Sequence, residues 1–232
     1  MVATVKKGLR KLLELGVDEL YHANSVLTSC QFLKHGALMS RGSIEALDLP
    51  QTAQYTDTLD RRYHIWNDVF VDSVDIHKRA SRANMYGPVL FVLDTEKLLQ
   101  DVNSGQIWIT RLNPTKWRGK TQEARWFVDA NDWDDFDANS FDEMVVFRHM
   151  GGILPIRNAL KHLVVDAPSN LDDRPELDLY SYAAGALKLA MHQGPKQVNV
   201  KKRVCVRRCS CETNYSDDED VTRMMYRPFA KD

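Results

Sequence analysis

Residues 86–94 read YGPVLFVLD, and the apolar side chains from Val89 to Leu93 follow one another without interruption. A continuous apolar run of this length indicates a strand that is covered on both of its faces. The run is much shorter than the about 18 residues that a membrane helix needs. We therefore predict a fully buried strand here and take it as the centre of the fold.

Further strands and several helices surround this run along the chain. Strand patterns occur at residues 18–26, 37–42, 106–110, 124–129, 143–147, 162–166 and 198–206. Helical spacing occurs at residues 5–16, at 26–36 after a Ser25 cap, at 67–77, and at 179–190 ahead of Gly194. Residues 46–62 show no clear period and are predicted to form a loop. Separate helical and strand-rich segments of this kind predict an α+β fold.

Composition and charge exclude several classes of protein. Lys and Arg number 31 and Asp and Glu number 32, a net charge of −1, which excludes a uniformly basic nucleic-acid coat but permits a local basic groove. No apolar run suits a membrane helix, so we expect no membrane partner. Cys205, Cys209 and Cys211 lie close together in the sequence and far from Cys30, and this spacing is not that of a disulfide framework. We therefore predict a reduced, cytoplasmic protein. The cysteine spacing is also unusual for zinc, and we expect no metal.

Three side chains in the segments LYHANSV, GALMSRG and DEMVVF suit chemistry on a sugar or a phosphate. His22 can hydrogen-bond a ribose or an amide, or its ring can simply be satisfied by the backbone. Arg41 offers a planar fork of donors for phosphate, although alone it reads as a surface arginine. Glu143, if it points into a cleft, can stabilise positive charge at an anomeric carbon. Outside a cleft it is only the last acid of a solvated loop.

The order and approximate spacing of His22, Arg41 and Glu143 resemble those of DarT-type ADP-ribosyltransferases, over residues 19–166. Enzymes of that family are toxins of toxin–antitoxin and phage-defence systems that transfer ADP-ribose from NAD to a nucleic-acid base. The resemblance implies an ADP-ribosyltransferase-like split β-sandwich that clasps NAD, with flanking helices and a C-terminal helix–strand extension. It also implies a single-stranded nucleic-acid substrate, DNA or RNA, and a cognate antitoxin protein as partner.

Each matching residue receives a role from this resemblance. His22 holds the ribose and nicotinamide end of NAD, with Asn24 and Ser40 beside the dinucleotide. Glu143 grips the 2″-hydroxyl of the nicotinamide ribose and favours the oxocarbenium ion that forms as nicotinamide leaves. Arg41 lies on the acceptor side, where it positions the base or stabilises charge, because a guanidinium rarely gives up a proton.

Two basic segments are candidates for contact with phosphates. Arg79 and Arg82 share a helical face in HKRASRAN, and we assign Arg79 to the NAD pyrophosphate and Arg82 to nucleic acid. Lys201, Lys202 and Arg203 form the strongest nucleic-acid footprint outside the core, and they also fit a groove for an acidic antitoxin. For both segments the alternative is a solvated charged face.

Other functions are compatible with the same residues. The predicted fold can also modify a protein side chain or only hydrolyse NAD, although Phe141 stands where arginine-modifying relatives carry Gln or Glu. A non-enzymatic nucleic-acid-binding module would use the basic strand and would not bind NAD. An RNA 2′-phosphotransferase would need a second His–Arg pair, which we do not find.

The chain is expected to divide at about residue 175. Residues 1–175 would form the ADP-ribosyltransferase-like catalytic core, and residues 176–232 a C-terminal helix and basic strand packed on it. No internal repeat and no low-complexity linker separates the two parts.

Overall fold

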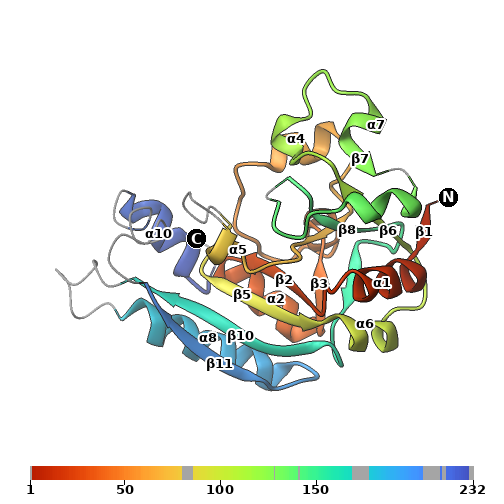
Figure 1. The fold of residues 1–232 in the computed structure, drawn as a ribbon. Coiled ribbons are helices and arrows are strands. Elements are labelled where there is room, and N and C mark those ends of the chain that lie inside the picture. Colours follow the sequence, from red (N-terminus) through yellow and green to blue (C-terminus); the bar gives the residue numbers. More distant parts are fainter. Residues whose placement is uncertain are drawn as a thin grey trace.

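The apolar run forms the strand β5 (Val89–Asp94) inside a four-stranded sheet, as the sequence predicts (Figure 1). The computed structural model describes residues 2–79, 86–127, 129–140, 142–168, 178–205, 215 and 218–229. β5 pairs antiparallel with β2 (Glu19–Asn24) on one side and with β10 (Leu160–Ala167) on the other. β11 (Asn199–Val204) runs parallel to β10 and forms the far edge of this sheet.

A second sheet carries the remaining long pairings. Its strands, in spatial order, are β1 (Ala3–Thr4), β6 (Gln106–Thr110), β8 (Val145–Arg148) and β4 (Val69–Val71), with β7 (Trp126–Phe127) paired to β6. A backbone bridge between Tyr21 and Asp72 connects this sheet to β2. A smaller pair consists of β3 (Ala37–Met39) and β9 (Ile153–Pro155). The split sheets and the flanking helices confirm the predicted α+β class.

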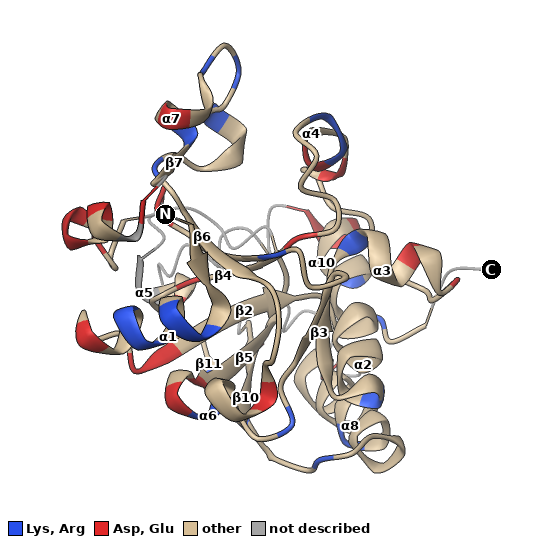
Figure 2. Cartoon of the chain, turned by 90° about the vertical axis from the view of Figure 1, so that its right-hand side faces the viewer, with Lys and Arg blue, Asp and Glu red and all other residues tan. Residues whose placement is uncertain are grey.

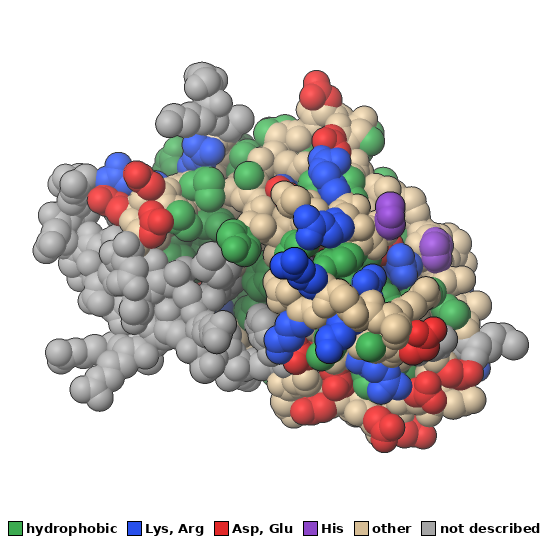
Figure 3. All heavy atoms as spheres, turned by 90° about the horizontal axis from the view of Figure 1, so that it is seen from above, with side chains coloured by type: hydrophobic (Ala, Val, Ile, Leu, Met, Phe, Trp, Pro, Cys, Tyr) green, Lys and Arg blue, Asp and Glu red, His purple; other side chains and the backbone are tan. Residues whose placement is uncertain are grey.

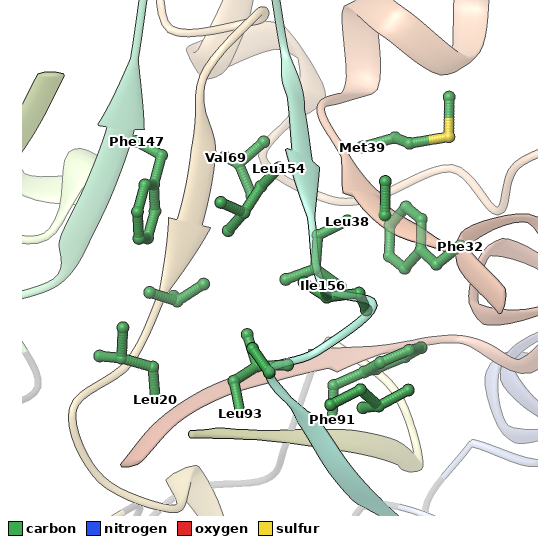
Figure 4. Packing of buried hydrophobic residues seen from close by; sticks show 14 of the residues in the cluster. Leu20, Phe32, Leu38, Met39, Val69, Phe91, Leu93, Phe147, Leu154 and Ile156 are labelled. Atoms are coloured by element: carbon green, nitrogen blue, oxygen red, sulfur yellow. The ribbon is translucent and has the colours of Figure 1, made fainter. Parts of the chain in front are cut away.

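The hydrophobic core lies where these sheets meet (Figure 4). Phe147 and Val69 from the second sheet point toward Leu20 and Leu93 from the first, and Leu154 of β9 lies between them. All of these side chains are buried. Because apolar burial is the main driving force of folding, this shared cluster holds the two sheets in a fixed relation.

Two helices begin at the predicted residues and end within two residues of the predicted ends. Thr4 caps α1 (Val5–Glu14) by accepting a hydrogen bond from the N–H of Lys7. Ser25 caps α2 (Val26–His35) through the N–H of Thr28, and the helix ends at Gly36, whose φ of +65° favours glycine. The other helical segments are α3 (Arg41–Ala46), α4 (Asp57–Arg62), α5 (Ile76–Arg79), α6 (Thr95–Asp101), η1 (Pro114–Lys116), α7 (Gln122–Arg125), η2 (Ala130–Asp135), α8 (Leu179–Gln193) and α10 (Glu219–Tyr226).

Two local predictions are wrong. The segment predicted as a helix over residues 67–77 begins as the strand β4, because Val69 and Val71 are buried and pair with Phe147 and Val145 of β8. Tertiary pairing here outweighs the helical spacing of the apolar residues. The segment 46–62, predicted as a loop, contains α4, a short helix with Asp57 and Asp60 in its first turn.

The C-terminal helix and strand share the core of the rest of the chain. Ala183 and Leu187 of α8 belong to the same hydrophobic cluster as Leu9 of α1 and Phe32 of α2. The helix α8 packs along α2 (Figure 1). A division of the chain at residue 175 stays a prediction. None of the helices in the described residues has the length and apolar character needed to cross a bilayer.

Candidate active site

A cleft opens between β2, β4, α4 and η1. It encloses about 830 Å³ that protein atoms do not fill, part of it continuous with bulk solvent. Residues 22, 41, 68 and 113, which are far apart in the sequence, all contribute to its wall. The fold therefore assembles the cleft from distant segments of the chain.

The structure brings some of the predicted site residues together and leaves others apart. His22, Asn24 and Arg41 line the cleft. Ser40 and Glu143 are not part of its wall, although their chain neighbours Met39, Arg41 and Met144 are. The side chain of Arg79 and the whole of Arg82 lie outside what the structure describes. Lys201, Lys202 and Arg203 belong to β11, at the far edge of the other sheet.

His22 has a fixed protonation state and orientation. Its Nδ1 lies 2.8 Å from the carbonyl oxygen of Phe70, which can only accept, so Nδ1 carries the proton. Its Nε2 therefore accepts a hydrogen bond from the side-chain amide of Asn24, at 3.1 Å. Burial lowers the pKa of His22 to about 4. The imidazole is thus neutral near pH 7 and acts as a rigid support for Asn24.

Asn24 is held at both ends of its amide group. Its Oδ1 accepts from the backbone N–H of Ser25 at 2.9 Å, and its Nδ2 donates to His22. An amide nitrogen has two N–H donors, so one is left for a ligand in the cleft. Gly87 lies against the backbone of the same residue, since a Cβ at position 87 would come within 2.3 Å of the carbonyl carbon of Asn24.

Arg41 forms a forked ion pair inside the cleft wall. Its Nε and Nη2 donate to the two carboxylate oxygens of Asp57 at 2.9 and 2.7 Å, and its Nη1 donates to the carbonyl of Thr52 at 2.8 Å. These three contacts use three of the five N–H donors of a guanidinium. The other two make no hydrogen bond to the described residues, and the side chain, which is 13% exposed, contributes to the wall of the cleft. Arg41 also ties the start of α4 to α3.

Glu143 does not contribute to the wall of the cleft. Its Oε2 accepts the backbone N–H of Asp137 at 2.7 Å, and partial burial raises the pKa of the carboxyl. The next residue, Met144, lines the cleft instead. Neighbouring residues of an extended segment point to opposite sides, so only one of the two can face inward. Its catalytic role stays a prediction.

Two further predicted binding residues have structural roles. Ser40 caps α3: its Oγ accepts the N–H of Ser43 at 3.1 Å and donates to the Ser43 hydroxyl at 3.0 Å, and the side chain is buried. Arg203 donates from Nε to Asp166 at 2.5 Å and from Nη1 to Asp75 at 2.8 Å. Its charge is therefore balanced by two carboxylates inside the protein, and its assignment to nucleic acid stays a prediction.

Sequence reasoning missed the acidic residues of the cleft. Asp60 of α4 borders the cleft, and burial raises its pKa to about 6. Its Oδ2 accepts a hydrogen bond of 3.3 Å from the hydroxyl of Thr56. Asp68 also borders the cleft and pairs with Arg148, with Oδ2 2.8 Å from Nε. The signal for Asp60 was the acidic start of the segment DTLDRR, which is typical of a helix N-terminus.

Neither of the two cysteines that the structure describes lines the cleft. Cys30 and Cys205 are both buried. Cys209 and Cys211, which belong to the spacing considered for zinc, lie outside the described residues.

Neutral His22 makes the stability of the protein depend on pH. Between pH 6.5 and about 4 the unfolded chain binds a proton at this position that the folded protein does not, so the free energy of unfolding falls as the pH drops through this window. We expect a contribution of about 3 kcal/mol. Urea unfolding of wild type and of His22→Gln at pH 7, 6, 5 and 4.5 measures it. The wild type should lose stability faster; parallel curves would contradict the assignment.

Comparisons with known proteins find similarity to solved structures. No family model and no curated protein matches the sequence. One similar solved structure is Thermus sp. 2.9 DarT in complex with ADP-ribosylated ssDNA. The match covers 81% of this chain and 95% of the DarT chain, with a TM-score of 0.49 and 11% sequence identity. For Thermus sp. 2.9 DarT in complex with carba-NAD+, the match covers 80% of this chain and 95% of the DarT chain, with a TM-score of 0.45 and 11% sequence identity.

Proposed function

We propose that this protein is an NAD-dependent ADP-ribosyltransferase that modifies a base of single-stranded nucleic acid. The observation that supports the proposal is the meeting of His22, Asn24 and Arg41 in one cleft. These are the residues to which the sequence resemblance gives NAD and acceptor roles. They come from β2 and α3, which the fold places on two walls of the same cavity.

The donors of the cleft fit a dinucleotide. NAD presents pyrophosphate oxygens, ribose hydroxyls and a carboxamide, and all of these accept hydrogen bonds. The free N–H of Asn24 and the two free N–H groups of Arg41 are donors of the required kind, held still by His22 and Asp57. Arginine is the better partner for phosphate here, because its planar fork stays charged and fixed in direction.

The reaction that we propose breaks the bond between the anomeric carbon of the nicotinamide ribose and the pyridine nitrogen. The electron pair leaves with neutral nicotinamide, and the positive charge stays on the sugar. A carboxylate stabilises such a cation through charge and through a hydrogen bond from the neighbouring hydroxyl. In this proposal Glu143 gives up its single hydrogen bond with Asp137 and turns toward the bound sugar.

The acceptor is a base that has left its stack. The ring nitrogens and exocyclic amines of a paired base are covered by its partner, whereas an unstacked base can enter a pocket. The acceptor atom bonds to the anomeric carbon and releases its proton to water at the open mouth of the cleft. Arg41 keeps its charge throughout and positions the acceptor, because a guanidinium does not serve as a base.

Mass spectrometry of nucleosides tests the proposal. Wild-type protein is incubated with NAD and with single-stranded DNA or RNA oligonucleotides, which are then digested to nucleosides. We expect one nucleoside to gain an ADP-ribosyl group, and the two arms separate DNA from RNA. Nicotinamide release that is equally fast without nucleic acid, with no modified nucleoside, would instead identify an NAD hydrolase. The absence of any thermal shift with NAD would support a non-enzymatic binding module.

The resemblance further implies that the enzyme acts as a toxin in the cytoplasm and is neutralised by an antitoxin. This part of the proposal stays a prediction. Coexpression with a neighbouring gene, scored by growth, tests it directly.

A further inference from the structure

The mouth of the cleft is bordered by α4 and η1. Gln54, Thr56 and Asp60 contribute to the wall on the α4 side, and Asn113 and Pro114 contribute at η1. A polymer that delivers a base into the cleft between α4 and η1 would contact the outer surface of these segments. The charge and the exposed aromatic rings of this outer surface therefore indicate how the substrate is held.

A stack of aromatic rings joins α4 to the segment around η1 and α7. Tyr63, at the end of α4, lies 5.3 Å from Trp117 between ring centroids, and Trp117 lies 4.9 Å from Trp126 of β7. The guanidinium of Arg125 lies 5.0 Å from the centre of the Tyr63 ring. Edge and cation contacts of this kind fix the rings in position. The outer surface of α4, η1 and α7 is thus a rigid platform.

Three cations on this platform are free. Arg62, Arg118 and Lys120 are exposed, and no acidic group of the described residues lies within ion-pair distance of any of them. Their neighbours differ, since Arg61 pairs with Glu45 at 2.7 Å and Lys116 with Asp142 at 2.8 Å. Lys and Arg side chains gather near the centre of the face seen from above (Figure 3), and both α4 and the loop before α7 carry them (Figure 2). We call Arg62, Arg118 and Lys120 the cationic rim.

An exposed aromatic side chain lies between two residues of the cleft wall. Tyr55 is 88% exposed, while Gln54 and Thr56 on either side of it border the cleft. Exposed aromatic rings beside a cationic surface bind single strands by stacking with bases, whose faces are free only when they are unpaired. Tyr55 therefore favours a single strand over a duplex or an acidic protein.

The basic strand β11 is a weaker candidate for the same task. Arg203 is bound to Asp166 and Asp75, and the Nζ of Lys202 lies 5.0 Å from the centre of the Tyr180 ring. The strand lies at the bottom of the view in Figure 1, and α4 and α7 lie at the top. A nucleic-acid strand bound at β11 would not pass the mouth of the cleft.

We propose that a single-stranded nucleic acid runs over the cationic rim, with one base stacked on Tyr55 as its neighbour enters the cleft. The inference rests on the proposed function for the identity of the polymer. The phosphates would lie over Arg62, Arg118 and Lys120, which makes binding depend on salt.

The test measures binding apart from catalysis. The rim variant Arg62→Gln, Arg118→Gln, Lys120→Gln is compared with a control of equal charge change on α1, α2 and α8, Lys7→Gln, Lys34→Gln, Lys188→Gln, whose lysines are exposed. The probe is a fluorescein-labelled 20-nucleotide oligothymidine, or the matching RNA or duplex, and anisotropy gives Kd over a range of NaCl. We expect the rim variant to weaken binding about tenfold or more and to reduce the slope of log K against log salt by about 2. The control should stay within about twofold of wild type.

Tyr55→Ala tests the stacking contact separately. It should weaken single-strand binding about tenfold with an unchanged salt slope, because the ring carries no charge. The thermal shift caused by NAD should stay as in wild type for all three variants, which excludes unfolding as the cause.

The outcomes separate this inference from the proposed function. Equal loss in the rim variant and the control, duplex binding as tight as single-strand binding, or no binding by wild type would overturn the inference. If the rim variant binds the oligonucleotide with wild-type affinity and still transfers ADP-ribose, the inference is overturned and the proposed function stands. A protein that binds oligonucleotide through the rim but modifies no nucleoside would refute the function and leave the binding surface.

Discussion

Arg41→Lys is expected to reduce ADP-ribose transfer about a hundredfold while the protein stays folded. A lysine keeps the charge but has a single ammonium group, which cannot bind both oxygens of Asp57 and the carbonyl of Thr52 at once. The start of α4 and the two donors that face the cleft would lose their fixed direction. Loss of one preorganised donor typically costs about 100-fold to 1,000-fold in rate. Transfer is measured as modified nucleoside per enzyme at saturating NAD.

Arg61→Lys is the matched control. Its partner is Glu45, and both side chains are about half exposed. Exposed pairs contribute about 0–1 kcal/mol, so this variant should transfer ADP-ribose within about twofold of wild type. If both variants lost activity equally, the forked pair of Arg41 with Asp57 would have no special role in the cleft.

Glu143→Gln is expected to abolish transfer to below about a thousandth of the wild-type rate, with little change in stability. The glutamine has the same shape and its side-chain carbonyl can still accept the N–H of Asp137, so the fold is kept. It has no negative charge, and the sugar cation is no longer stabilised. The measurement is the single-turnover rate of nicotinamide release, together with the melting temperature.

Asp60→Asn shows which carboxylate carries that role. Asp60 contributes to the wall of the cleft, whereas Glu143 does not. If Glu143 is the catalytic acid, Asp60→Asn should change the rate by about tenfold at most. A wild-type rate for Glu143→Gln together with an inactive Asp60→Asn would transfer the role to Asp60.

Much of the fold follows from neighbouring residues in the chain. The run from Val89 to Leu93 predicts the buried β5, and Ser25 and Gly36 mark the ends of α2. Such signals are readable because a cap or an apolar run acts through residues that are a few positions apart. The resemblance carried by the order of His22 and Arg41 likewise predicts that these residues share a site, and both line the cleft.

Other features depended on contacts between distant segments. The proton of His22 is placed by Phe70, 48 positions away, and Arg203 is neutralised by Asp75, 128 positions away. The strand β4 forms where the sequence suggested a helix, because β8 offers a partner. The orientation of Glu143 and the free charges of the cationic rim also became visible only in the fold. Local patterns determine backbone preference, whereas the burial and pairing of a charged group are determined by whichever remote segments pack around it.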